Sequence, residues 1–168
     1  MNKYKIIVSI LFFVLVNSIK AQNLNKVVVS NSIEMNTKMD EVWTAISNLG
    51  NLDVLVPDII GKTEMIGNGK GSVVTLTLKS NGLQVVEKII KLDNEKHVIV
   101  YKMLETPMPI EDYKAKIKID PINSVKYKVN FTAIFRVNPS DKETMETTID
   151  NFQKTLLSNI KKTYNNEK

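Results

Sequence analysis

The sequence predicts an α+β fold in which a curved antiparallel sheet of about seven strands wraps around one long C-terminal helix. Short segments with apolar residues at every second position are separated by turns rich in glycine, asparagine and aspartate, as in an antiparallel meander. The clearest segment has one apolar face formed by Val125, Tyr127, Val129, Phe131, Ala133, Phe135 and Val137. The chain then ends in an amphipathic helix with an apolar stripe of Met145, Ile149, Phe152, Leu156 and Ile160. One apolar sheet face and one apolar helix stripe are expected to pack against each other.

The N-terminal part of this fold is expected to contain one strand and two short helices. Apolar residues over 27–35 indicate the strand. Asp40 then begins a helix whose apolar residues Val42, Ile46 and Leu49 recur at helical spacing. A second helical turn is expected over 52–56, because Pro57 follows it.

The remaining elements are six strands and the long helix. The strands are expected over 62–66, 72–78, 83–92, 97–104, 112–119 and 125–137. Ser140 or Asp141 is a suitable N-cap for the helix. The segment Gly67–Gly71 precedes a strand instead of a helix, so it is interpreted as a hairpin turn and not as a phosphate-binding loop.

Composition excludes several classes of site. The chain of 168 residues contains no cysteine and only one histidine, His97. Disulfides, thiolate metal sites, cysteine nucleophiles and multi-histidine metal centres are therefore excluded. No metal, no cofactor and no catalytic residue is predicted.

Residues 1–21 have the pattern of a cleaved signal peptide, which leaves 22–168 as the mature ligand-binding domain. Lys3 and Lys5 precede an apolar stretch over 6–16, and Ala21 offers a cleavage point. Removing the three lysines of this leader lowers the formal charge from +5 to +2, so bulk charge does not favour nucleic acid. The sequence thus predicts a bacterial protein that is periplasmic or secreted.

Several ordered motifs resemble one superfamily. They are the segments 42–52, 57–59, 71–73, 87–99 and 109–113. Together they make the chain similar to the START-like, Bet v 1-like (SRPBCC) superfamily, in particular its polyketide cyclase/dehydrase and lipid-transport branch. The resemblance implies a helix-grip fold with a small hydrophobic ligand held between the sheet and the C-terminal helix.

Within this superfamily, residues 87–113 resemble the plant abscisic-acid receptors most closely. That resemblance implies that Glu87 is a polar group inside the cup and that Tyr113 lines it. The receptors' latch histidine and arginine are missing from the segment 107–110, so abscisic acid itself is not implied.

Glu87 is the most informative candidate residue. Val85 and Ile89 share its strand face, which is expected to point inward. A buried carboxyl group needs a partner or a raised pKa. Glu87 is therefore expected either to orient a ligand hydroxyl, to act as a general acid, or simply to bond to Tyr101 or Tyr113.

The other predicted ligand contacts are apolar or aromatic. They are Tyr101, Met103, Met108, Ile110, Tyr113, Phe131, Phe152 and Leu156. The proline-framed loop 105–112 is interpreted as a lid over the cavity. The alternative is that these residues are ordinary core and that the cup is packed shut. Trp43 is expected in the core, and His97 is expected to be exposed and inert.

Lysines alternate along two neighbouring strands and are expected on the outer face of the sheet. They are Lys114, Lys116, Lys118, Lys126 and Lys128, with Arg136 beside them. One interpretation is a solvated face that prevents edge aggregation. The other is weak contact with an anionic membrane surface.

Three functions remain open on the sequence. The leading hypothesis is an exported binding or transport protein for a lipid-like or polyketide-like ligand. The second is a cyclase or dehydratase that uses an internal pair of glutamate and tyrosine. The third is an accessory protein of a periplasmic enzyme system. Only the first two need an open cavity.

Overall fold

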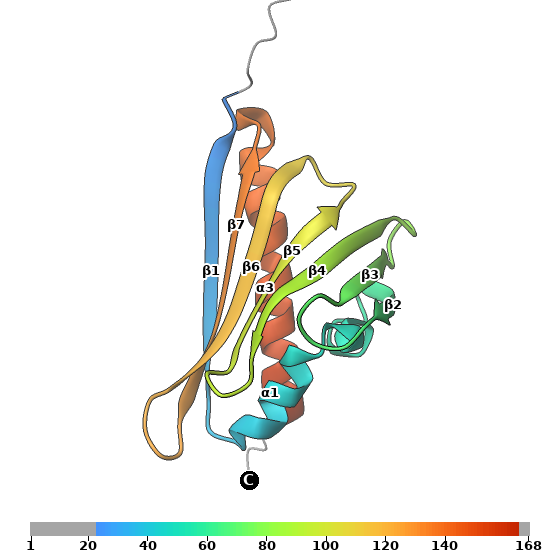
Figure 1. The fold of residues 1–168 in the computed structure, drawn as a ribbon. Coiled ribbons are helices and arrows are strands. Elements are labelled where there is room, and N and C mark those ends of the chain that lie inside the picture. Colours follow the sequence, from blue (N-terminus) through green and yellow to red (C-terminus); the bar gives the residue numbers. More distant parts are fainter. Residues whose placement is uncertain (1–22, 165–168) are drawn as a thin grey trace, which may run out of the picture.

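The structure, a computed structural model, describes residues 23–164 (Figure 1). Its elements in chain order are β1 (Asn25–Met35), α1 (Met39–Ser47), the 3-10 turn η1 (Leu49–Asn51), α2 (Leu52–Leu55), β2 (Ile60–Ile66), β3 (Val73–Leu78), β4 (Gln84–Asp93), β5 (Val98–Glu105), β6 (Ile110–Pro121), β7 (Tyr127–Val137), the 3-10 turn η2 (Pro139–Asp141) and α3 (Lys142–Tyr164). The predicted α+β helix-grip architecture is confirmed. The predicted signal peptide lies outside the described residues.

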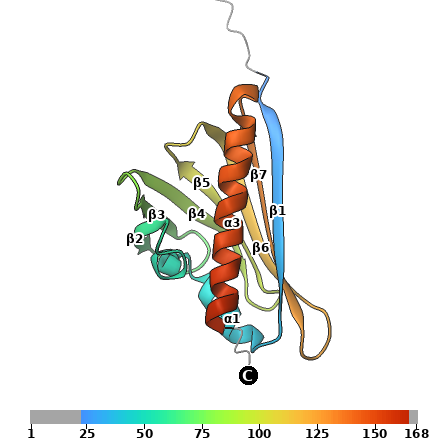
Figure 2. The same ribbon diagram turned by 180° about the vertical axis from the view of Figure 1, so that it is seen from behind.

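All seven strands form one antiparallel sheet in the order β1-β7-β6-β5-β4-β3-β2. Strands β1 and β2 are therefore its two edges. The first strand pairs with β7 along its whole length, from Asn25 opposite Val137 to Met35 opposite Tyr127. Figure 2 shows α3 across one face of the sheet, and it runs in the same direction as β1. The helix and the inner sheet face enclose the core.

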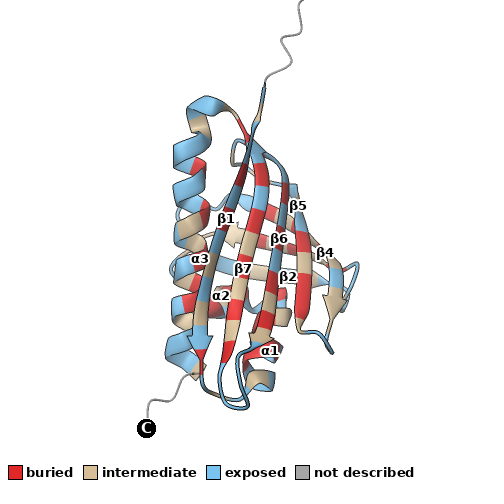
Figure 3. Cartoon of the chain, turned by 90° about the vertical axis from the view of Figure 1, so that its left-hand side faces the viewer, coloured by how far each residue is buried: buried red, intermediate tan, exposed pale blue. Residues whose placement is uncertain are grey.

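Buried and exposed residues alternate along the strands, and the buried ones, drawn as red bands in Figure 3, form this core. In β7 every second residue from Tyr127 to Val137 is at most 1% exposed, whereas the residues between them face outward. A fully buried side chain of this size stabilises the fold by about 1.5–3 kcal/mol. The period-two pattern therefore decides which face of β7 meets α3.

The apolar stripe of α3 is buried much as predicted. Met145, Ile149, Leu156 and Ile160 are buried, and Phe152 is half-buried. A polar residue, Gln153, is also completely buried, which the sequence pattern did not indicate. Its amide Nε2 donates to the carbonyl of Val29 (3.4 Å), and its Oε1 accepts from Asn31 Nδ2 (3.0 Å). Gln153 thus joins the middle of α3 to the middle of β1.

Irregular pairing near the start of β6 sets the direction of Tyr113. The register between β6 and β7 shifts between Glu111 and Lys114, and Asp112 has a positive φ of 52°. Glu111 and Asp112 are both exposed, and only then does Tyr113 point inward. A bulge moves the following residues to the opposite face of a strand. Without it, Tyr113 would face solvent.

Some predicted boundaries were wrong. Val125 is 64% exposed and precedes β7, because its N–H is bonded to Asn123 Oδ1 (2.9 Å) in the turn after β6. The expected loop over 105–112 is confined to 106–109, since Glu105 ends β5 and Ile110 begins β6. Ser140 and Asp141 lie within the 3-10 turn that precedes α3.

The expectation that His97 is exposed was also wrong, whereas its inertness stays a prediction. It lies in the turn before β5 with a positive φ of 47°, and only 23% of its side chain is exposed. Its ring packs edge-on against Trp43, with centroids 5.3 Å apart. Trp43 is buried as predicted, and its Nε1 donates to Asn94 Oδ1 (3.1 Å). The β4–β5 turn therefore docks on α1 through its histidine and asparagine.

The glycine-rich segment between β2 and β3 is a turn, as expected. Gly67, Gly69 and Gly71 have φ values of 93°, 80° and 97°, which residues with a Cβ rarely adopt. Within residues 23–164, no helix is both long and apolar enough to cross a membrane.

Candidate functional site

A cavity of about 470 Å³ lies between the inner sheet face and the first half of α3. Its wall comes from the strands β2 to β6, the loop before β6, the segment before β2, the β3–β4 turn, and α3. The lining residues are Asp58, Ile59, Ile60, Leu76, Leu78, Ser80, Val85, Glu87, Met103, Met108, Tyr113, Thr148, Ile149, Asn151 and Phe152. This volume is typical of a site for a small organic molecule, and most of the wall is apolar.

Glu87 is a charged residue type placed in this apolar wall by β4. It is 4% exposed, and its neighbours on the inner face, Val85 and Ile89, are buried as well. Burial raises the pKa of Glu87 from 4.5 to about 8. Its Oε2 has no hydrogen-bond partner within the described part of the chain. At neutral pH, Glu87 is therefore largely a neutral carboxylic acid with a polar atom left for another molecule.

Two buried tyrosines stand near Glu87. Burial is the main cause of the raised pKa of Tyr113, and the charge of Glu87 adds to it. The pKa of Tyr101 is raised as well, first by burial and then by the charges of Tyr113 and Glu87. The ring of Tyr113 is stacked on Phe135, with centroids 6.3 Å apart. Glu87, Tyr101 and Tyr113 thus form one polar cluster inside the core.

Five of the nine predicted ligand contacts lie in the cavity wall: Glu87, Met103, Met108, Tyr113 and Phe152. Met108 is half-buried and packs against the core, so the short loop at 106–109 covers this end of the cavity. The backbone carbonyl of Met108 accepts from the N–H of Ile110 (2.8 Å), which holds the loop in a tight turn. A role of these residues in binding stays a prediction.

The other four predicted contacts do not line the cavity. Phe131 is fully buried beneath Phe152, and their rings meet edge-on with centroids 6.4 Å apart. Leu156 lies about one turn further along α3 and is buried. Tyr101 is buried and interacts with Tyr113, and Ile110 is buried at the start of β6. All four side chains are buried, but none of them is part of the cavity wall.

Sequence reasoning missed the mouth of the cavity. Asp58, Ser80, Thr148 and Asn151 line it and are exposed, so they form a polar rim. They come from three distant segments of the chain. The only signal was on α3, where Thr148 and Asn151 flank the apolar stripe at Ile149 and Phe152.

The described residues contain no cluster of three or more His, Asp or Glu side chains that could hold a metal ion. The Glu87 cluster is thus the main chemical feature of the cavity. Its arrangement can donate a hydrogen bond to an oxygen atom of a bound molecule, or transfer a proton to it.

The outer face of the sheet carries a row of three lysines. Lys88 of β4 is paired with Lys102 of β5, which is paired in turn with Lys114 of β6. Lys116 lies two residues further along β6 and is also exposed. Among the described residues, none of these four forms an ion pair, whereas Lys118 is paired with Asp120. Lys88 and Lys102 were not part of the predicted basic patch, and they extend the row across β4 and β5. Of the predicted residues, Lys118 forms an ion pair, Lys128 lies opposite Glu34 and Asp120, and Lys126 precedes β7.

Solved structures with this fold include two enzymes and the Bacillus cereus protein XoxI. Norcoclaurine synthase from Thalictrum flavum, in complex with dopamine and hydroxybenzaldehyde, is 22% identical, with a TM-score of 0.72 over 95% of each chain. The aromatase/cyclase Zhui from Streptomyces sp. R1128 is 18% identical, with a TM-score of 0.70 over 81% of this chain and 92% of Zhui. XoxI from Bacillus cereus is 17% identical, with a TM-score of 0.72 over 82% of this chain and 94% of XoxI. At these identities the likeness is one of fold.

The family of the chain is shown by its sequence. No curated protein sequence matches the chain. The model of the family described as polyketide cyclase / dehydrase and lipid transport matches residues 26–165, which include every strand and helix of the structure except the first residue of β1. The chain therefore belongs to the polyketide cyclase/dehydrase and lipid transport family.

Proposed function

We propose that this protein binds one small, largely apolar molecule in the cavity beneath α3 and carries it. The observation on which this rests is the buried Glu87 carboxyl, whose Oε2 has no hydrogen-bond partner among residues 23–164 and which lies in a mostly apolar wall. An unsatisfied polar atom at such a position costs about 1–3 kcal/mol, and a ligand that bonds to it removes this cost. Glu87 therefore selects for a molecule with one polar group at a defined place.

The protonation state of Glu87 narrows the ligand chemistry. Because its pKa is raised to about 8, the carboxyl group is mostly protonated at neutral pH and donates a hydrogen bond. A carbonyl, ether or hydroxyl oxygen is the matching acceptor. An anionic headgroup placed beside Glu87 would be repelled once the carboxyl ionises. The expected cargo is thus an uncharged lipid-like or polyketide-like molecule with an oxygen function.

The direct test is native mass spectrometry of the gently purified protein, followed by organic extraction of any bound compound. We expect an apolar compound at near one-to-one stoichiometry. The Glu87→Leu variant, which removes the polar group but keeps the wall apolar, is the matched comparison and is expected to lose the compound. If both proteins retain it equally, Glu87 does not select the ligand. If the compound is charged, the proposed ligand class is wrong.

One observation favours an enzyme as the alternative. A carboxyl group with a pKa near neutrality, in one cavity with a tyrosine hydroxyl, is suited to general acid–base catalysis such as a cyclisation or dehydration. Glu87→Gln keeps a hydrogen-bond donor but cannot transfer the proton. Conversion of the identified compound that vanishes in this variant, with affinity nearly unchanged, would establish the enzyme and reject simple carriage.

Export belongs to this proposal, because residues 1–21 have the signal-peptide pattern. N-terminal sequencing of the protein from a bacterial periplasmic fraction is expected to begin at or near Gln22. A carrier and an accessory protein of a periplasmic enzyme system would both be exported, but the accessory role predicts a stable protein partner and an empty cavity. A pull-down from the periplasmic fraction distinguishes the accessory role from the carrier role.

The lysine row on the outer face could bring the carrier and its ligand to a membrane. We propose that Lys88, Lys102, Lys114 and Lys116 make weak contact with an anionic membrane surface, where each lysine contributes about 1 kcal/mol. Three like charges on neighbouring strands destabilise the sheet slightly, so a counter-charge outside the protein would stabilise this face.

A further inference from the structure

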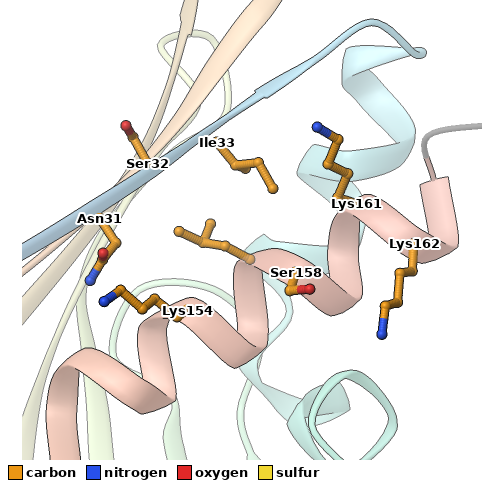
Figure 4. A pocket seen from close by; sticks show the side chains of 8 residues that line it. Asn31, Ser32, Ile33, Lys154, Ser158, Lys161 and Lys162 are labelled. Carbon is orange, nitrogen blue, oxygen red and sulfur yellow. The ribbon is translucent and has the colours of Figure 1, made fainter. Parts of the chain in front are cut away.

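The free edge of the sheet at β1 is bordered by two grooves that run between β1 and α3. The first, of about 430 Å³, is lined by Val28, Val29 and Ser30 of β1 and by Glu143, Glu146, Thr147 and Asp150 of α3. The second, of about 630 Å³, continues along Asn31, Ser32 and Ile33 and is lined on α3 by Lys154, Leu157, Ser158, Lys161 and Lys162 (Figure 4). One groove is therefore acidic on its helix side, and the next is basic.

The charges of α3 are concentrated on this side of the helix. Of the seven charged residues in α3, only Lys142 lies outside the two grooves. The helix macrodipole favours acidic residues near the N-terminus and basic ones near the C-terminus, but it does not favour one face over another. The exposed residues elsewhere on α3 are mostly threonine and asparagine. The position of these charged residues along β1 therefore has a cause other than the helix macrodipole.

Strand β1 also carries one charge of each sign, in the order opposite to that of α3. Lys26 and Glu34 are both exposed on the outer face of β1, and each is four residues from Ser30. When two such strands are antiparallel and centred on Ser30, Lys26 of each copy lies opposite Glu34 of the other. Opposite charges in such positions stabilise a strand pair.

The helix and the strand share one centre. Asn31 Nδ2 donates to Asp150 Oδ1 (2.8 Å) and to Gln153 Oε1 (3.0 Å), and Gln153 donates to the carbonyl of Val29. Residues 29–31 of β1 are thereby fixed beside residues 150–153 of α3. This is also the boundary between the acidic and the basic half of the helix. A single twofold axis at this point thus matches opposite charges on both elements.

We propose that two copies of this chain associate edge to edge about that axis, with β1 against β1 and α3 against α3. The acidic residues Glu143 and Glu146 of one copy meet Lys161 and Lys162 of the other, and the same contact occurs twice. None of these four side chains forms an ion pair within residues 23–164, so all are available. A self-complementary patch of this kind is what a twofold homodimer requires. It also covers the exposed edge of the sheet.

Charge reversal tests the arrangement. The wild-type protein at about 100 μM and low salt is expected to have twice the monomer mass in sedimentation analysis. The Glu143→Lys/Glu146→Lys variant makes the helix face basic except at Asp150, and the Lys161→Glu/Lys162→Glu variant makes it acidic except at Lys154. Each variant alone is expected to be monomeric. An equimolar mixture of the two is expected to regain the dimer mass, because every contact then joins opposite charges.

The matched control is Lys114→Glu/Lys116→Glu, which changes two charges on the outer face and is expected to leave the dimer intact. Circular dichroism of each variant verifies that it is folded. A wild-type protein that stays monomeric at 100 μM overturns the proposal. So does a dimer that survives both reversals, or a mixture that fails to reassociate. Exclusive binding of a different protein at this edge would show that the patch serves another partner.

Discussion

Glu87 of β4 and Tyr113 of β6 line the same cavity, although β5 lies between their strands. The charge of Glu87 adds to the effect of burial on the pKa of Tyr113, so the two groups are close enough to influence each other. The two residues reach the inner face in different ways. Glu87 alternates regularly with Val85 and Ile89 along β4, whereas Tyr113 points inward only because the β6–β7 register shifts just before it. The polar cluster thus combines a regular strand with a local bulge.

The pH dependence of stability is the first prediction, and it concerns Glu87. Its pKa is about 8 in the folded protein and 4.5 in the reference state, so folding takes up a proton between these pH values. The free energy of unfolding therefore falls as the pH rises from about 4.5 to about 8 and then stays lower. The cost is on the order of 5 kcal/mol at most.

Glu87→Gln removes this proton uptake. Urea unfolding at pH 5 and pH 9 is expected to show a marked loss of stability in the wild type and a much smaller one in the variant. The exposed Glu105 provides the control, since Glu105→Gln is expected to leave the pH dependence unchanged. Identical pH dependence in the wild type and Glu87→Gln would show that Glu87 is not buried as described.

Two phenylalanines that contact each other are expected to differ in role. Phe131→Ala leaves a hole in the closed core and is expected to cost about 3–5 kcal/mol in the free energy of unfolding. Phe152 is half-buried at the cavity wall, so Phe152→Ala is expected to cost less than half as much. Phe152→Ala is nevertheless expected to weaken binding of the copurified compound more. Urea unfolding and ligand titration of both variants measure this, and equal costs would contradict the assignment.

Gln153 is expected to be important for stability although it is polar. Gln153→Ala removes the side-chain donor to the Val29 carbonyl and one of the two acceptors of the Asn31 amide, and it opens a small cavity. We expect a loss of about 2–4 kcal/mol in the free energy of unfolding, from the unsatisfied polar groups and the lost packing. Thr144→Ala, at an exposed position of the same helix, is the comparison and is expected to change stability by less than about 0.5 kcal/mol.

The central lysine of the outer row links stability to membrane contact. Lys102 lies between Lys88 and Lys114, so Lys102→Glu replaces two repulsive pairs by two attractive ones. The free energy of unfolding is expected to rise by about 0.5–1 kcal/mol. Binding to vesicles that contain anionic lipid is expected to weaken in the same variant, and wild-type binding is expected to decrease with salt. Vesicle binding that is insensitive both to salt and to this substitution would rule out the proposed contact.

Much of the architecture could be predicted because it depends on the spacing of apolar residues within single strands and helices. The alternation from Tyr127 to Val137 predicts a strand with one buried face, and the stripe from Met145 to Ile160 predicts the helix that covers it. The same reasoning placed Glu87 on the inner face, between Val85 and Ile89. Side chains alternate along any regular strand, so these conclusions needed no knowledge of other elements.

Which inward residues reach the cavity depended on the tertiary structure. Phe131 and Leu156 are buried, but neither of them is part of the cavity wall. Gln153 is buried because β1 offers it polar partners from a segment more than a hundred residues away. His97 is covered because its turn folds back on Trp43. Local sequence patterns contain no information on such distant neighbours.

The sequence by itself therefore determined the class of fold and the inward position of Glu87, since both follow from residue spacing along single elements. It also determined the family, through motifs that span nearly the whole chain. The tertiary structure decided that the cup encloses about 470 Å³, that a polar rim surrounds its mouth, and that the charges of α3 lie along the free edge of β1. These features arise where elements distant in the chain meet. Their geometry is set by sheet curvature, bulges and helix placement, which result from the packing of the whole domain.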